Sequence, residues 1–182
     1  MEILPDDDEP LKLIGLFTVQ FATAEAGLDI CNAIIFQHCG GSSVQPEIPR
    51  SLERKISFFK RCQAECRLIS AQPDFCEVGY RIADEFSSLR DDRHFLIHGI
   101  GSSLLKDQSF TQLKIRHAKT GIRFDEKVMS AASVTKLIAR CFDLSKETIV
   151  YIIFLLRFMP DDKLDKLVSE LGVEFFRGFP NG

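Results

Sequence analysis

The sequence lacks the features that mark secreted, membrane-spanning or disordered proteins. Met1 is followed by acidic residues instead of a basic segment and an apolar stretch, so no secretory signal is expected. The longest strongly apolar run, from Ile149 to Met159, is interrupted by Arg157 and is far shorter than the roughly 20 residues that cross a bilayer. With 45% hydrophobic and 27% charged residues, the composition is that of an ordinary globular domain. These absences predict a cytoplasmic protein that does not bind a membrane.

The sequence also lacks a strong positive charge and a convincing metal-ligand pattern. Its formal net charge of -3 excludes a protein that coats nucleic acid through its overall field, so any RNA contact must be local. Six cysteines are present, and in a cytoplasmic chain we expect reduced thiols. Cys62 and Cys66 lie one helical turn apart, but a tetrahedral zinc site needs two more ligands, and no second close Cys or His pair lies nearby in the sequence. We therefore expect no metal and no cofactor.

The 182 residues are expected to form one helical domain between two short terminal segments. Residues 1–10 are acidic and contain two prolines, which predicts a flexible arm, and residues 172–182 form an aromatic C-terminal tail. Residues 11–171 between them carry apolar side chains at helical spacing. Four long helices and a short one are expected, at residues 11–39, 51–70, 73–99, 130–159 and 161–171.

One stretch before the last long helix has a strand pattern. Apolar residues from Phe110 to Phe124 flank the turn Lys119-Thr120-Gly121, which predicts a β-hairpin, whereas residues 99–107 are expected to form a loop. The predicted fold class is therefore all-α. It is a helical bundle of four long helices plus a short C-terminal helix, with a small β-hairpin before the last long helix.

Polar residues interrupt the apolar stripes of two predicted helices. Glu25 and Asn32 occupy positions of the first helix where a purely structural helix would place apolar side chains. Arg93 lies on the inward stripe of the third. An unpaired buried charge costs several kcal/mol, so Arg93 must pair with a carboxylate or face a cleft. The predicted partner is Glu25.

Ionisable side chains concentrate at the end of the third helix. Arg90, His94 and His98 recur every four residues and share one face, and the long side chain of Arg93 reaches around from the adjacent row. Gly99 should place His98 in the last helical turn. There the negative end of the helix dipole favours a protonated imidazole, which suits general acid and base chemistry.

This segment resembles the HEPN superfamily (higher eukaryotes and prokaryotes nucleotide-binding). Its members are small helical bundles that commonly carry Arg, four to six residues, then His, here Arg93 and His98. A polar residue often follows the arginine, and His94 fills that position, where Asn is commonest. The match lies at the end of a long helix before a glycine, with a long apolar helix after it. The resemblance covers roughly residues 11 to 159.

The resemblance implies a metal-independent endoribonuclease that works as a homodimer, with two motifs in one composite cleft. His98 would take the proton from the ribose 2′-hydroxyl, and Arg93 would stabilise charge on the phosphoryl oxygens. His94 would orient substrate or supply a second proton, with Glu25, Asp92 and Asn32 supporting these groups. Cleavage would leave a 2′,3′-cyclic phosphate. Such a protein can be the toxin of a toxin-antitoxin or defence system, with an antitoxin-like protein as partner.

Two basic segments would supply the contacts to RNA. Arg50 to Arg67 holds six basic and two acidic residues, and the predicted hairpin holds basic residues with no acid. The candidate phosphate-binding side chains are Arg54, Lys55, Arg90, Lys114 and Arg116. A helix face and a hairpin this rich in charge can equally be a solvated surface.

Two other interpretations of the Arg-His segment stay open. A non-catalytic HEPN-like dimer with a binding or regulatory role would have the same fold, with Arg93 and Glu25 as a structural pair. His94 and His98 could instead bind a metal ion, with Asp91 or a residue from another helix as third ligand, although the general base of an HExxH motif is absent.

Overall fold

The computed structural model describes the backbone of residues 9–98, 100–104, 109–118 and 121–170, and side chains from 12 to 97 and from 128 to 165. The helices in these ranges are α1 (Glu9–His38), α2 (Gly41–Val44), α3 (Leu52–Glu65), α4 (Arg67–Ser70), α5 (Pro73–His98), α6 (Ala131–Leu156) and α7 (Asp161–Glu170). The strands are β1 (Ile100–Leu104), β2 (Ser109–Ala118) and β3 (Gly121–Ser130). The described chain is therefore mostly helical, as the all-α prediction states.

The predictions for the two ends of the chain fall mostly outside these ranges. Residues 1–8 and the aromatic tail at 172–182 are not among the described residues. The acidic arm expected at 1–10 overlaps the start of α1, which includes Glu9 and Pro10.

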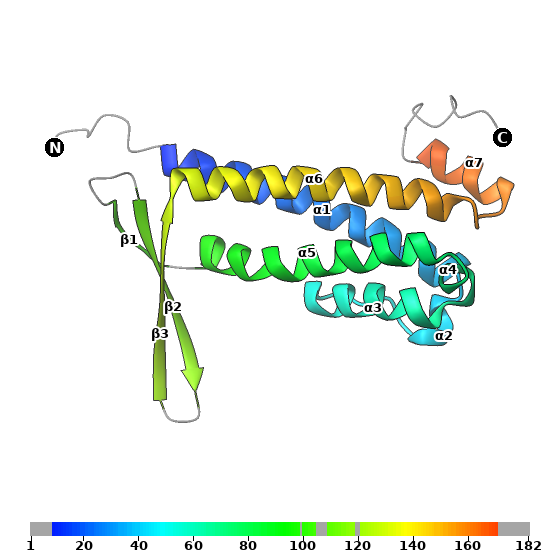
Figure 1. The fold of residues 1–182 in the computed structure, drawn as a ribbon, viewed down its shortest axis with the longest axis horizontal. Helices are drawn as coiled ribbons and strands as arrows, with labels where there is room; N and C mark the ends of the chain where they lie inside the picture. Colours follow the sequence, from blue (N-terminus) through cyan, green and yellow to red (C-terminus); the bar gives the residue numbers. More distant parts are fainter. Residues whose placement is uncertain (1–8, 99, 105–108, 119–120, 171–182) are drawn as a thin grey trace.

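Three long helices form the body of the bundle (Figure 1). α1 and α6 lie side by side and run in the same direction, α5 runs the opposite way along them, and α3 extends along only part of their length. Aromatic contacts join the helices: the ring centroids of Phe21 and Phe86 are 6.3 Å apart, and those of Phe59 and Tyr151 are 5.2 Å apart. All four rings are buried, and each such side chain contributes about 1.5–3 kcal/mol to folding.

Local sequence signals set several helix ends. Ser130 caps α6 by accepting a hydrogen bond from the backbone N–H of Ser133, whose hydroxyl oxygen accepts one from the backbone N–H of Ser130 at 2.9 Å. Pro73 is the first residue of α5, where its missing N–H removes no helical bond. Gly40 follows α1 with φ of 88°, a left-handed conformation that glycine adopts without strain.

The helix predicted at 51–70 is divided in two. Cys66 adopts an extended conformation (φ -81°, ψ 112°) between α3 and α4. No proline or glycine marks this position. Cys66 and Ile69 are both buried, so tertiary packing, which local sequence does not reveal, accompanies the break. Ser51 precedes α3 as predicted, but its side chain makes no capping hydrogen bond.

An antiparallel sheet of order β1-β2-β3 follows α5 and extends away from the bundle (Figure 1). The predicted hairpin corresponds to β2 and β3, which pair from Ser109 opposite Ser130 to Ala118 opposite Gly121. The loop expected at 99–107 contains β1, which pairs with β2. The sequence Ile-Gly-Ser-Ser-Leu has little strand pattern of its own, and its pairing with β2 is a contact that local sequence does not encode.

One described helix, Lys12–His38 within α1, is long and apolar enough to cross a membrane by length and composition alone. The core helix of a soluble protein passes the same test, so the finding is weak support for a membrane span. The prediction of no such segment considered only the run near Ile149. Of the most apolar 18 residues of α1, 22% are buried, and among the described large apolar side chains of α1 Leu16 and Val19 are exposed.

Candidate functional site

Arg93 lies near the end of α5 and is half-buried. Its guanidinium carbon is 5.3 Å from the centroid of the Phe21 ring on α1. Such a cation–π contact contributes about 0.5–2 kcal/mol, depending on burial. Among the side chains that the structure describes, no carboxylate pairs with Arg93. Its fork of N–H donors is therefore not committed to an acid on the described part of the chain.

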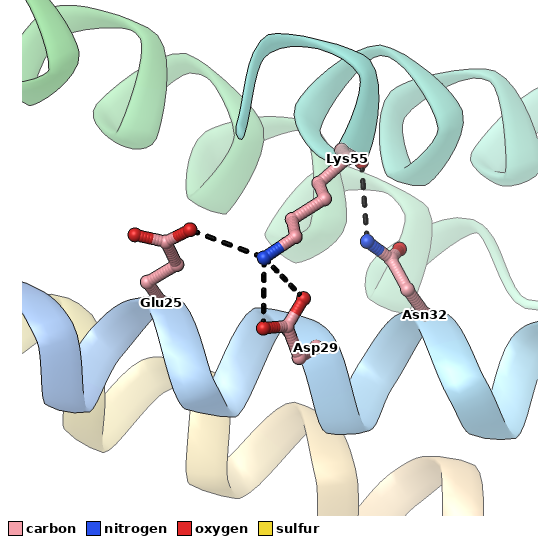
Figure 2. Close-up of polar contacts among 4 residues, drawn as sticks. All are labelled: Glu25, Asp29, Asn32 and Lys55. Carbon is pink, nitrogen blue, oxygen red and sulfur yellow. Dashed lines mark hydrogen bonds and ion pairs between the residues drawn. The ribbon is translucent and has the colours of Figure 1, made fainter. Parts of the chain in front are cut away.

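The predicted pairing of Arg93 with Glu25 does not form. Glu25 instead accepts a hydrogen bond from Lys55 Nζ on α3 at 3.1 Å, and Lys55 also reaches Asp29 at 2.8 Å (Figure 2). The reason is geometric: Arg93 contacts Phe21, about one helical turn before Glu25, whereas α3 packs directly over the next turns of α1.

These carboxylates also change the role expected of Lys55. Burial lowers the pKa of the amine, but the hydrogen bonds to Asp29 and Glu25 outweigh it and raise the pKa. Lys55 is thus charged and already bound to two acids, so it is poorly placed to take a phosphate. Lys60 pairs with Asp84 and Arg61 with Glu65 in the same way, which favours a solvated, locally neutralised surface for α3.

Asn32 supports the packing of α3 on α1 and lies away from Arg93. Its side-chain Nδ2 donates to the backbone oxygen of Lys55 at 3.2 Å, and the residue is fully buried (Figure 2). Eleven residues separate Asn32 from Phe21, which is about 16 Å along a helix. Within the described residues, its Oδ1 atom has no hydrogen-bond partner.

Arg140 on α6 was missed by the sequence analysis and ties α6 to the middle of α5. It donates to Glu85 at 2.7 and 3.0 Å and to the hydroxyl of Ser88 at 2.8 Å, and it lies 3.9 Å from Asp92. The hydrogen bond with Glu85 raises the pKa of Arg140. The signal that could have revealed it is the polar series 85, 88 and 92 on one face of α5, opposite a single arginine in an apolar part of α6.

The other predicted site residues are only partly described. His94 is half-buried, and Arg90 pairs weakly with Asp91 at 3.4 Å. His98 is the last residue of α5, as predicted, but its side chain lies outside the described residues. The same holds for Lys114 and Arg116, which lie on β2, a strand that packs next to α5. Arg54 is exposed on the first turn of α3.

Metal ligation and thiol chemistry find little support in the described part of the chain. No group of three His, Cys, Asp or Glu side chains there lies close enough to hold an ion. All six cysteines are free thiols, and five are buried. Burial raises the pKa of Cys39 and of Cys141 to about 12, so these thiols are poor nucleophiles near neutral pH.

With metal ligation and thiol chemistry set aside for the described residues, the candidate chemical group is the Arg93 guanidinium near the end of α5. A guanidinium that rests on an aromatic face and is not paired with Glu25 can bind an anion such as a phosphate. No family model matches the chain, and no curated protein or solved structure matches it either. The function is therefore inferred from these side chains.

Proposed function

We propose that this protein is a HEPN-like, metal-independent endoribonuclease with Arg93 and His98 as its acting residues. The observation that supports this proposal is the half-buried Arg93 guanidinium, which has Phe21 beneath it and no carboxylate partner among the described side chains. An arginine with a purely structural role at this depth is usually paired with an acid. An arginine left without one keeps its N–H donors for the phosphate of a substrate.

In the proposed reaction, His98 accepts the proton of the ribose 2′-hydroxyl. The 2′-oxygen attacks the adjacent phosphorus, and the bond from phosphorus to the 5′-oxygen breaks. Arg93 stabilises the charge on the phosphoryl oxygens, and His94 protonates the departing 5′-oxygen. The products are a 2′,3′-cyclic phosphate and a 5′-hydroxyl.

A toxin in a toxin-antitoxin or defence system is the role that suits this activity. Uncontrolled RNA cleavage would then require an antitoxin-like protein partner. The resemblance further implies a homodimer whose two motifs share one cleft. The shared cleft requires the second copy to bind on the face that carries the motif.

The alternative is a non-catalytic HEPN-like binding or regulatory dimer. The contact of Arg93 with Phe21 supports it, because a cation–π contact satisfies part of the charge without a substrate. The two proposals share the fold and differ in whether the end of α5 performs chemistry.

Cleavage of end-labelled single-stranded RNA in EDTA tests the proposal. The wild-type chain should cut RNA and should not cut a substrate in which every 2′-hydroxyl is replaced by hydrogen. His98→Ala should slow cleavage roughly 100- to 10,000-fold, because a general base is removed. His38→Ala, at the end of α1, is the matched control and should cut at the wild-type rate. Equal rates for His98→Ala and wild type, or no cutting by wild type, would reject the proposal.

A further inference from the structure

The side of α6 that faces away from α5 carries exposed apolar side chains. Arg140 and Phe142 are two residues apart, about 200° around the helix, and Arg140 contacts Glu85 on α5, so Phe142 points away from α5. Phe142 is 52% exposed, and Ile149 and Val150, two turns later, are 50% and 58% exposed. We call Phe142, Ile149 and Val150 the α6 face. Single exposed apolar residues are ordinary, but a group on one side of a helix marks an interaction surface.

Two charged side chains lie beside the α6 face. The Nζ atom of Lys146 is 4.2 Å from the centroid of the Phe142 ring, and it also pairs with Asp143 at 3.4 Å. A segment that covers the face therefore meets an ammonium group and a carboxylate next to the apolar side chains. The face suits a segment in which aromatic residues stand next to charged ones.

The aromatic tail at residues 172–182 has this composition. It carries three phenylalanines and two oppositely charged residues: Phe175, Phe176, Phe179, Glu174 and Arg177. Phenylalanine is among the residues that proteins most often bury. The acid of the tail can pair with Lys146, and its base can pair with Asp143. The tail and the α6 face therefore match in both apolar character and charge.

The tail is also long enough to reach the α6 face. α7 turns back from the end of α6 on the side away from α5, and the described backbone ends with α7 at Glu170 (Figure 1). Measured from Leu156 at the end of α6, Ile149 lies about 10 Å back along the helix and Phe142 about 21 Å back. An extended chain spans about 3.3 Å per residue, so the six residues from Glu170 to Phe176 span up to about 20 Å.

We propose that the aromatic tail docks on the α6 face of its own chain. Its phenylalanine rings cover Ile149 and Val150, and Glu174 lies beside Lys146. A segment joined to the bundle by a short connection is present at an effective concentration of the order of millimolar. The tail therefore occupies the α6 face ahead of a free partner, which would have to displace it.

Docking on the α6 face leaves the Arg93 site uncovered. Arg93 lies on α5 and contacts Phe21 on α1, whereas the α6 face points away from α5. A second copy can still bind on the face that carries the Arg93 motif. The inference does not rest on the nuclease proposal, because the position of the tail is measured without RNA.

The fluorescence of a single tryptophan placed in the tail tests the inference. The chain has no tryptophan, so Phe176→Trp in the full chain gives an emission that reports on the tail alone. In the folded chain this emission should be shifted to the blue and quenched less by acrylamide than in urea, because the docked indole is shielded from water. Adding Ile149→Glu should shift the emission to the red and raise the quenching to the level in urea, since a charge then lies under the ring.

Leu68→Glu provides the matched control. Leu68 is on α4, outside the α6 face, and is 44% exposed, so its substitution should leave the emission of the Phe176→Trp chain unchanged. Circular dichroism verifies that each variant is folded. If the chain with Ile149→Glu does not fold, the milder Ile149→Ser replaces it and should give a smaller red shift.

Other outcomes would overturn the inference. One is a folded Phe176→Trp chain whose emission is as red and as strongly quenched as in urea. Another is a blue-shifted emission that Ile149→Glu leaves unchanged, which would place the ring elsewhere on the bundle. A blue shift that is lost on dilution would assign the tail to another copy, and one that appears only with phosphatidylcholine vesicles would assign it to a lipid surface.

Discussion

The half of the bundle that α3 covers differs from the half beyond it. In the covered half, Tyr151 and Gln63 form a buried hydrogen-bonded pair: the Tyr151 hydroxyl donates to Gln63 Oε1 at 2.5 Å, and Gln63 Nε2 donates to the Phe59 carbonyl oxygen at 2.8 Å. Burial raises the pKa of Tyr151, so its hydroxyl keeps its proton near neutral pH. In the other half, Arg93 is half-buried with an aromatic ring as its described partner.

This comparison separates stability from function within one fold. Where α3 packs on α1, the half-buried Lys55 is paired with Glu25 and Asp29. Beyond α3, the last turns of α5 carry Arg93 and His94 and lead into the sheet. Substitutions in the half that α3 covers should therefore mainly lower stability, and substitutions at the end of α5 should mainly lower activity.

The largest stability effect is expected in the covered half, at Phe59. Phe59→Ala should lower the free energy of unfolding by about 3–5 kcal/mol, because it removes a fully buried ring that packs against Tyr151. Urea denaturation measures the change. Leu68→Ala is the control, and its effect should stay within about 0.5 kcal/mol because that side chain is 44% exposed. Similar losses in both variants would remove the distinction between the covered core and the surface.

A substitution of Arg140 should affect both stability and activity, because Arg140 joins α6 to α5. Arg140→Ala should lower stability by about 1 kcal/mol, since its ion pairs are partly exposed to solvent. It should also slow RNA cleavage about tenfold, because the last turns of α5 lose one of the contacts made by Asp92. Arg140→Lys should restore part of the rate. A variant that loses stability without any change of rate would limit Arg140 to packing.

The smallest effect is expected at the Glu25–Lys55 pair. Glu25→Gln should cost about 1 kcal/mol of stability and leave the rate of RNA cleavage unchanged, since Glu25 binds Lys55 and not Arg93. A loss of cleavage in this variant would contradict the assignment.

The pH dependence of stability tests the same pair. The ion pairs raise the pKa of Lys55 above the unfolded value. The contribution of these ion pairs to the free energy of unfolding should be complete below about pH 10.5 and lost as the pH rises through the raised pKa of Lys55. Lys55→Met should show no such loss. The measurement is thermal unfolding of both chains across this pH range. An equal pH dependence of stability in wild type and variant would contradict the pairing.

The sequence was sufficient for the helices whose ends carry local signals and insufficient where distant residues decide. Pro73 and Ser130 start α5 and α6 as predicted, because each acts on its own first turn. The break at Cys66 depends instead on packing, and β1 depends on its pairing with β2. Local sequence contains neither contact.

The same limit applies to the candidate site. The spacing of Arg93 and His98 placed both at the end of α5, where the structure has them. The choice of Lys55 as the partner of Glu25 depends on where α3 crosses α1, a distance between helices that periodicity does not specify. The role of Arg140 was missed for the same reason.

The rate of RNA cleavage by Arg93→Ala, measured in EDTA together with its thermal unfolding, tests the central claim most directly. Arg81→Ala, an exposed arginine on the same helix paired with Glu147, is the matched control. The account predicts that Arg93→Ala cleaves roughly 100- to 1,000-fold more slowly, because a donor to the phosphoryl oxygens is lost. Its stability should change by no more than about 2 kcal/mol, the upper contribution of one cation–π contact. An Arg93→Ala chain that cuts at the rate of wild type and Arg81→Ala while unfolding at a much lower temperature would contradict the account and make Arg93 a structural residue.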